Sequence, residues 1–305
     1  MKVSESKDDI SKEKLISLRE RAQLSKNISP EFKLFIEIIT EIINISNILD
    51  KIYEKGYPKD IIVNINIKVN VIKKENNAIE LDSKITYCLD NDKPQTNYKE
   101  LIEQLKKILS FLKTKQIESY KEKPLIRYLY GRQFKLLYDY FKSNSSLKTN
   151  EKQANSLFKY ITNDLFKNNI KSGNVEDKGN VIDNNINICD IYLNEIIAGN
   201  GLTLDKIYEN TIISEKLKKE KYQGIYIYLC EKLEKDLFQI YKYLTGNNPI
   251  AQNVLLCNKI TTNEQITAFL YRAILCEFNS CFIVGGIELL NNDQKTYLIE
   301  LLNCN

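Results

Sequence analysis

The segment 253–305 constrains the fold most strongly, because short apolar runs alternate in it with stretches of helical periodicity. Residues 254–257 form a compact apolar run with the length of a strand that is buried on both faces. Thr262, with Gln265 three residues later, is placed to form a capping box for the helix that follows. Residues 281–284 form a second buried run. A last helix covers 296–302. This order predicts a strand–helix–strand–helix unit, which is half of an α/β domain.

The amino-terminal part of the chain predicts helices around one β-hairpin. Residues 1–29 are polar, and Pro30 stands at the first position of an amphipathic helix that Gly56 and Pro58 end. Over 61–89, apolar residues alternate with polar ones on two arms, a period typical of strands with one buried and one solvated face. We therefore expect an antiparallel hairpin whose apolar face packs on the flanking helices, since an isolated hairpin is only marginally stable.

Helical periodicity returns after the hairpin. Amphipathic patterns cover three stretches (98–117, 124–141 and 154–166). The segment 169–188 is rich in Asn, Gly and Asp, which is typical of a linker. It would separate a helical domain at 30–168, with the hairpin inserted, from a helical lead-in and partial α/β unit at 189–305. The predicted fold class is therefore α+β and mostly helical.

Composition excludes several classes of function. The chain of 305 residues contains no histidine. Ser–His and Cys–His hydrolases, histidine-ligated zinc and imidazole acid–base chemistry are therefore excluded. The 44 Lys and Arg residues are interleaved with 40 Asp and Glu residues, for a net charge of +4. This balance gives no reason to expect nucleic acid as a partner.

The sequence also predicts where the protein resides. The first nine residues lack an apolar core, so we expect no secretory signal. The longest apolar stretch, 32–49, contains Glu37 and Glu41 and does not have the pattern of a membrane span. Seven cysteines, an odd number in a chain without an export signal, are typical of reduced thiols. We therefore expect a cytoplasmic protein with no transmembrane segment.

Three stretches that resemble functional motifs lack the partners that the chemistry needs. No glycine begins a phosphate-binding P-loop, and the Gly-Asn-Gly at 199–201 lacks a preceding strand and a third glycine, which favours a plain turn. Glu288 follows an apolar run, as in nucleotide hydrolases, but without the second acid that helps to hold magnesium, which favours a solvated glutamate. Cys276 and Cys281 have no second pair of zinc ligands.

Two further patterns bear on RNA binding. Aromatic side chains recur between residues 128 and 141 and could stack on bases, but their spacing favours the core of a helix. Lysines at 216–221 lie among glutamates, which is typical of a solvated helix face. RNA binding is therefore the least favoured of the functions that we consider.

Several short motifs resemble the mysterin family, whose members are giant ring-finger ubiquitin ligases built around a dynein-like ring of AAA+ modules. The likeness is densest after Gly224, where VLLC, TT, an acid, F and RA follow in the order found ahead of the ATPase modules of that family. Weaker likeness extends back to about residue 30. The matching residues include Val254, Leu255, Leu256, Cys257, Thr261, Thr262, Glu264, Phe269, Arg272, Ala273 and Glu288.

The resemblance implies that the carboxy-terminal unit is AAA+-like. Family activities are ATP hydrolysis and ubiquitin transfer, with ATP, Mg and Zn as cofactors. The Walker loops and zinc-binding fingers would lie downstream of the residues present, so no catalytic, cofactor-binding or metal-ligating residue carries over to this chain. Asn263, where an acid is commoner, and the pair Gly285 and Gly286 depart from the family pattern.

Two functions from different classes follow. The first is a non-catalytic scaffold, a fragment or paralogue of a mysterin-like AAA+ E3 ubiquitin ligase, whose partners are other segments of an AAA+ ring or other proteins. The second is a stand-alone helical protein–protein interaction module. Limited proteolysis would separate them, because a module would resist cleavage by itself over 224–305.

Overall fold

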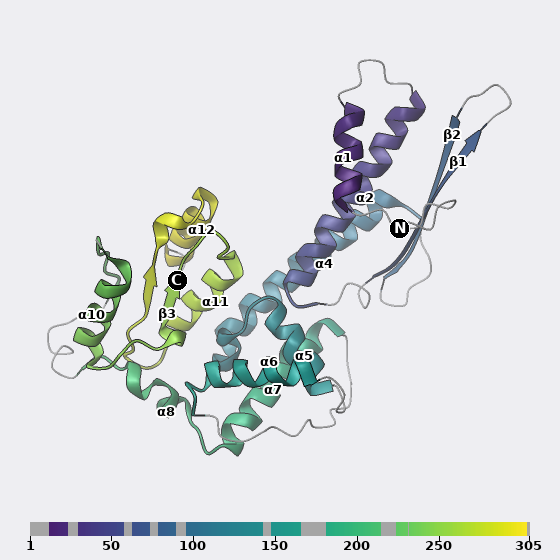
Figure 1. The fold of residues 1–305 in the computed structure, drawn as a ribbon. Coiled ribbons are helices and arrows are strands. Elements are labelled where there is room, and N and C mark those ends of the chain that lie inside the picture. Colours follow the sequence, from purple (N-terminus) through teal and green to yellow (C-terminus); the bar gives the residue numbers. More distant parts are fainter. Residues whose placement is uncertain are drawn as a thin grey trace. The chain divides into compact units, whose positions relative to one another are not determined.

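The chain is mostly helical and divides into two compact units (Figure 1). The computed structural model describes residues 12–23, 30–57, 63–73, 79–89, 96–142, 148–165, 181–214, 224–230 and 232–303. Unit 1 is Met1–Thr114 and unit 2 is Lys115–Asn305. The boundary lies inside α4 (Tyr98–Glu122), whereas composition places the linker at 169–188.

Unit 1 begins with two packed helices, α1 (Lys12–Gln23) and α2 (Pro30–Glu54). Pro30 is the first residue of α2, and Gly56 lies just beyond its end with a φ of 88°. Lys12 also forms an ion pair with Asp50 at 2.6 Å. The core between the helices contains Leu15, Ile38, Ile39, Ile42 and Ile43.

Two long strands follow α2. β1 (Val63–Lys73) and β2 (Ile79–Leu89) pair antiparallel, with Val63 opposite Leu89 and Lys73 opposite Ile79. Ile85 and Tyr87 of β2 are buried, and β2 contacts α2. The first part of α4 completes the unit with the buried side chains Leu101, Leu105 and Leu112.

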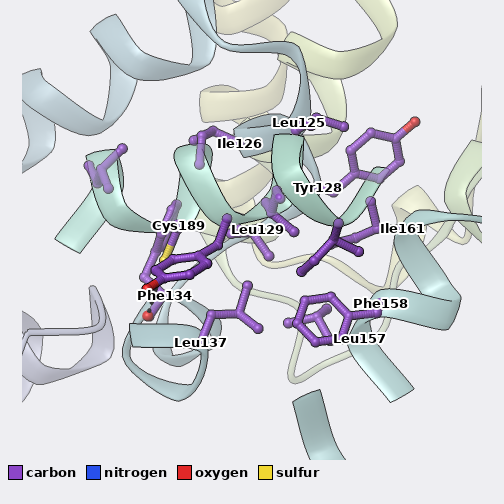
Figure 2. Close-up of a cluster of buried hydrophobic side chains, with 14 of the residues drawn as sticks. Leu125, Ile126, Tyr128, Leu129, Phe134, Leu137, Leu157, Phe158, Ile161 and Cys189 are labelled. Carbon is purple, nitrogen blue, oxygen red and sulfur yellow. Dashed lines mark hydrogen bonds between the residues drawn. The ribbon is translucent and has the colours of Figure 1, made fainter. Parts of the chain in front are cut away.

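Unit 2 contains a helical layer with a large apolar core. Figure 2 shows side chains from its successive elements meeting in this core. The elements are the end of α4, η1 (Pro124–Tyr128), α5 (Arg132–Lys142), α6 (Lys148–Ile161), α7 (Val181–Gly199), α8 (Leu204–Tyr208) and η2 (Glu209–Thr211).

Helix α7 corrects part of the predicted linker. Residues 181–188 belong to α7, and Ile186 and Ile188 are buried in the core of unit 2. The predicted helical lead-in at 189 therefore starts earlier, at Val181, because the apolar residues of α7 are held by packing although asparagines surround them. The remainder of the predicted linker, 169–180, lies outside the described residues.

The carboxy-terminal part of unit 2 has the strand–helix–strand–helix order that the sequence predicts. β3 (Val254–Leu256) and β4 (Ile283–Gly285) are parallel, and α11 (Asn263–Ile274) connects them. α12 (Asn292–Asn303) packs on α11, and α10 (Leu233–Thr245) lies against β4. Two 3₁₀ turns, η3 (Ala251–Asn253) and η4 (Ile287–Leu289), flank the strands. None of the described helices is long and apolar enough to cross a membrane.

This α/β layer shares its core with the helical layer. Ala268 and Tyr271 of α11 pack in the large helical core, whereas Phe269 and Leu270 pack in a second cluster with α12. The segment 266–272 is buried without interruption. α11 is therefore the central helix of unit 2, and the α/β layer is not a domain by itself.

Candidate functional site

The residues at which the sequence resembles the mysterin family lie in β3, in the turn that follows it and in α11, apart from Glu288. Thr262 is the N-cap of α11: its Oγ1 accepts from the N–H of Gln265 at 3.2 Å, while Gln265 Oε1 accepts from the N–H of Thr262 at 2.8 Å. The predicted capping box is therefore confirmed. It satisfies two backbone donors that a helix start leaves unpaired. Glu264, in the first turn, lies near the positive end of the helix dipole.

The turn between β3 and α11 is held by side chains of the same motif. Thr261 is buried, and its Oγ1 accepts from the N–H of Asn258 at 2.8 Å. Cys257 donates its N–H to the carbonyl of Gly285 at 2.8 Å and buries its side chain, which raises the pKa of the thiol to about 11. Both residues therefore position the backbone, and the Cys257 thiol stays protonated at neutral pH.

Arg272 is the most unusual member of the group, because this charged residue is only 3% exposed. Its Nη1 donates to the carbonyl of Arg127 at 2.9 Å and its Nη2 to the carbonyl of Gln252 at 2.6 Å. The guanidinium carbon lies 4.8 Å from the ring centroid of Tyr128 and 5.3 Å from that of Phe269. Arg272 thus links α11 to η1 and η3.

Arg127 is a second buried arginine, and its position could not be inferred from spacing because it lies far from Arg272 in the sequence. Its Nε donates to the carbonyl of Tyr120 at 2.6 Å, its Nη2 to that of Lys121 at 3.1 Å and its Nη1 to that of Leu275 at 2.7 Å. These carbonyls lie near the ends of α4 and α11, where a cation stabilises the helix dipole. Burial lowers the pKa of Arg127.

The two arginines define the junction between the helical layer and the α/β layer. Neither forms an ion pair with a carboxylate of the described residues, so each charge is compensated by carbonyl dipoles and aromatic faces. All three nitrogens of the Arg127 guanidinium donate to carbonyls, whereas Nε of Arg272 is buried without a hydrogen-bond partner among the described residues. We call Arg127 and Arg272, with the carbonyls that they bind, the arginine junction.

A groove lies beside the arginine junction. Its volume is about 420 Å³, within the range of small-molecule pockets. Several of its polar groups are already paired: Gln133 Oε1 accepts from the N–H of Tyr130 at 3.0 Å, and Gln265 Nε2 donates to Tyr130 Oη at 3.1 Å. Its lining is Tyr130, Gln133, Leu136, Gln153, Ser156, Leu157, Tyr160, Val254, Leu255, Gln265, Ala268, Phe269 and Arg272. No carboxylate or thiol is among these residues, and the hydroxyl groups of the lining belong to Tyr130, Ser156 and Tyr160.

Glu288 and Ala273 lie at the margin of the site. Gly286 has a φ of 73° and leads the chain into η4, where Glu288 is exposed. A Cβ at Gly286 would come within 2.7 Å of the carbonyl oxygen of Cys257, so glycine is required there. Among the described residues, no three His, Cys, Asp or Glu side chains group together as metal ligands would. Ala273 is half-buried on α11.

The remaining candidates from the sequence are the aromatic side chains, the glycine turn, the cysteines and the lysines. Tyr128, Phe134 and Phe141 are buried, as the helix-core interpretation predicts, and stacking on bases is excluded for these three rings. The glycine turn at 199–201 ends α7, and the five cysteines whose side chains are described, which include Cys276 and Cys281, are free thiols. The lysines at 216–221 lie outside the described residues.

No known protein family, no curated protein and no solved structure matches this chain.

Proposed function

We propose that this chain is a non-catalytic scaffold segment of an AAA+-type assembly similar to the mysterin ubiquitin ligases. The arginine junction is the observation that carries the proposal. Arg272, the cation of the motif, is engaged in contacts that join α11 to η1 and η3, while Thr261 and Thr262 fix the turn that leads into α11. These contacts support an architectural role for the three residues.

The small parallel sheet supports the AAA+-like part of the proposal. β3 and β4 are linked by the helix α11 as in a β–α–β unit of a nucleotide-binding fold. Each strand has three residues, and apolar side chains at Leu256 and Leu289 remain exposed near the sheet. Parallel sheets are normally buried on both faces, so we expect further segments of a ring to complete this one.

Under this proposal the protein acts in the cytoplasm through other segments of an AAA+ ring. ATP, Mg and Zn would be bound by those segments and not by this chain. Its contribution would be a rigid body that presents the groove and the sheet to its neighbours.

The alternative is a stand-alone helical interaction module. One observation favours it: the helical layer and the α/β layer share a core, so unit 2 is a compact body without added segments. A module would need no AAA+ partner to protect its carboxy-terminal part from proteases.

A binding experiment separates these functions. The probe is the purified AAA+ core of a mysterin-family ligase, titrated against the chain by biolayer interferometry and followed by limited proteolysis. A scaffold segment should bind it with micromolar affinity, and 224–303 should become more resistant to cleavage on binding. Leu256→Asp should abolish the binding, whereas the control Ile191→Asp, also at an exposed apolar residue, should leave it unchanged.

The converse results would favour the module: no association, with 224–303 already resistant in the isolated chain. A fluorescent ATP analogue with Mg provides a direct check on the non-catalytic assignment. Saturable micromolar binding of the analogue to the isolated chain would contradict it.

A further inference from the structure

An exposed apolar segment precedes α10. Residues 224–230, Gly-Ile-Tyr-Ile-Tyr-Leu-Cys, have no regular secondary structure. Ile227 is 91% exposed and Leu229 101%, while the tyrosines between and before them, Tyr226 and Tyr228, are 52% and 58% exposed. Neither Ile227 nor Leu229 has a backbone hydrogen bond to another described residue. An exposed apolar run of this length commonly marks a surface that binds another protein.

A sheet edge without a partner strand occurs in the same unit. The N–H of Cys257 donates to Gly285, and in a parallel ladder the bonded residues alternate. Leu255 and Cys257 therefore direct their backbone groups to β4, while those of Val254 and Leu256 point to the opposite edge of β3. No other described strand pairs with that edge, and Leu256 is half-exposed.

Neither surface has the features that prevent edge pairing. Natural edge strands avoid association by carrying charged residues, proline or bulges. The apolar segment, 225–229, contains no charge and no proline, and neither does β3. Its alternation of Ile and Tyr is also the pattern of a strand, although none of the described strands pairs with it.

We propose that residues 225–229 of one copy pair with the free edge of β3 in a second copy, and that the exchange is reciprocal. Main-chain hydrogen bonds would provide the affinity, as in other cases of strand addition. The groove that Val254 and Leu255 border would receive side chains of the added strand. Because each copy contains both surfaces, a reciprocal exchange between two copies gives a closed two-fold dimer.

The area involved is adequate for a second copy as the occupant. Five large side chains that are each more than half exposed present on the order of 500 Å². Two segments and the two edges that receive them would bury on the order of 1,500 Å², the size of a standard stable interface. The absence of charge on both surfaces also removes electrostatic repulsion between copies. This dimer does not depend on the scaffold function proposed above.

Sedimentation velocity of the full chain between about 1 and 200 µM tests the proposal. We expect a monomer–dimer equilibrium, which Ile227→Lys should weaken at least tenfold because a charge enters the added strand. Ile227 has almost no contacts to lose, so the variant should retain the circular dichroism spectrum of the original chain. The matched control Ile191→Lys, at an exposed residue of α7, should change the dimer dissociation constant less than twofold.

Disulfide formation tests which surfaces meet. Cys230 is an exposed thiol at the end of the segment, and Lys259 is exposed just beyond β3. A copy with Cys230→Ser and Lys259→Cys should form a disulfide with an unaltered copy of different mass. A chain that stays monomeric at 200 µM, or a dimer that Ile227→Lys leaves intact, would overturn the proposal. So would the absence of a disulfide between Cys230 of the unaltered copy and Lys259→Cys of the other in a sample that is dimeric.

Discussion

Replacement of Arg272 by methionine should destabilise the protein by about 3 kcal/mol, and the structure provides each contribution. The carbonyls of Arg127 and Gln252 would lose their charged donor while remaining buried, at about 1–2 kcal/mol each. Loss of the guanidinium above Tyr128 and Phe269 would remove about 1 kcal/mol more. Methionine has a similar volume and carries no charge to desolvate, which returns about 1 kcal/mol.

Arg272→Lys tests the geometry separately from the charge. A lysine keeps the positive charge, but an ammonium group cannot bind two carbonyls in the plane of a guanidinium or stack in the same way. We expect a loss of about 2 kcal/mol, intermediate between the original chain and Arg272→Met. The exposed Arg132 on α5 provides the control, since Arg132→Met should change the free energy of unfolding by less than about 1 kcal/mol.

Urea unfolding followed by far-UV circular dichroism measures these differences, provided that the slope of free energy against urea stays constant among the variants. If Arg272→Met unfolds within 1 kcal/mol of Arg132→Met, the two carbonyls do not depend on Arg272. The arginine junction would then not be the element that holds the two layers of unit 2 together.

Two further predictions concern the sheet. Gly286→Ala should lower the free energy of unfolding by about 2–3 kcal/mol, because φ is positive there and the new Cβ would meet the carbonyl oxygen of Cys257. Gly199→Ala, with open space around the new Cβ, should be neutral or stabilising, and thermal unfolding compares the two variants. Burial raises the pKa of Cys281 from about 9.0 to about 12, so the folded chain keeps a proton that the unfolded chain loses above pH 9. The contribution of the buried thiol to stability is complete below pH 9 and declines towards pH 12. Cys281→Ala should therefore be less stable than the original chain by about 1 kcal/mol at pH 8, and this difference should be removed by pH 10. Urea unfolding at both pH values measures the difference, and a value that stays constant would contradict the prediction.

The parts of the fold that the sequence predicts are those that local contacts determine. Thr262 and Gln265 are three residues apart, and their capping box follows from the helical backbone alone. Pro30 begins α2 because its fixed φ suits the first turn. The apolar runs before and after α11 contain β3 and β4, and both strands are short because polar residues or glycines bound each run.

Long-range packing determines what the sequence could not predict. Asparagines made the start of α7 resemble a linker, yet Ile186, Cys189 and Leu193 recur at helical spacing and are buried in the core of unit 2. Arg127 and Arg272 are buried only because helix ends from distant segments place carbonyls around them. No periodicity in a single segment indicates such a contact.

One signal for the continuity of unit 2 is nevertheless present in α11. A helix at the surface buries one stripe, whereas residues 266–272 of α11 are buried on all sides. In sequence this stretch reads Ile-Thr-Ala-Phe-Leu-Tyr-Arg, apolar almost throughout, which is the composition of a helix between two layers. Ala268 and Tyr271 face one core and Phe269 and Leu270 the other, so a single stripe could never have accounted for this helix. The helical layer and the α/β layer must therefore fold around α11 together, and a substitution at the arginine junction should destabilise both layers.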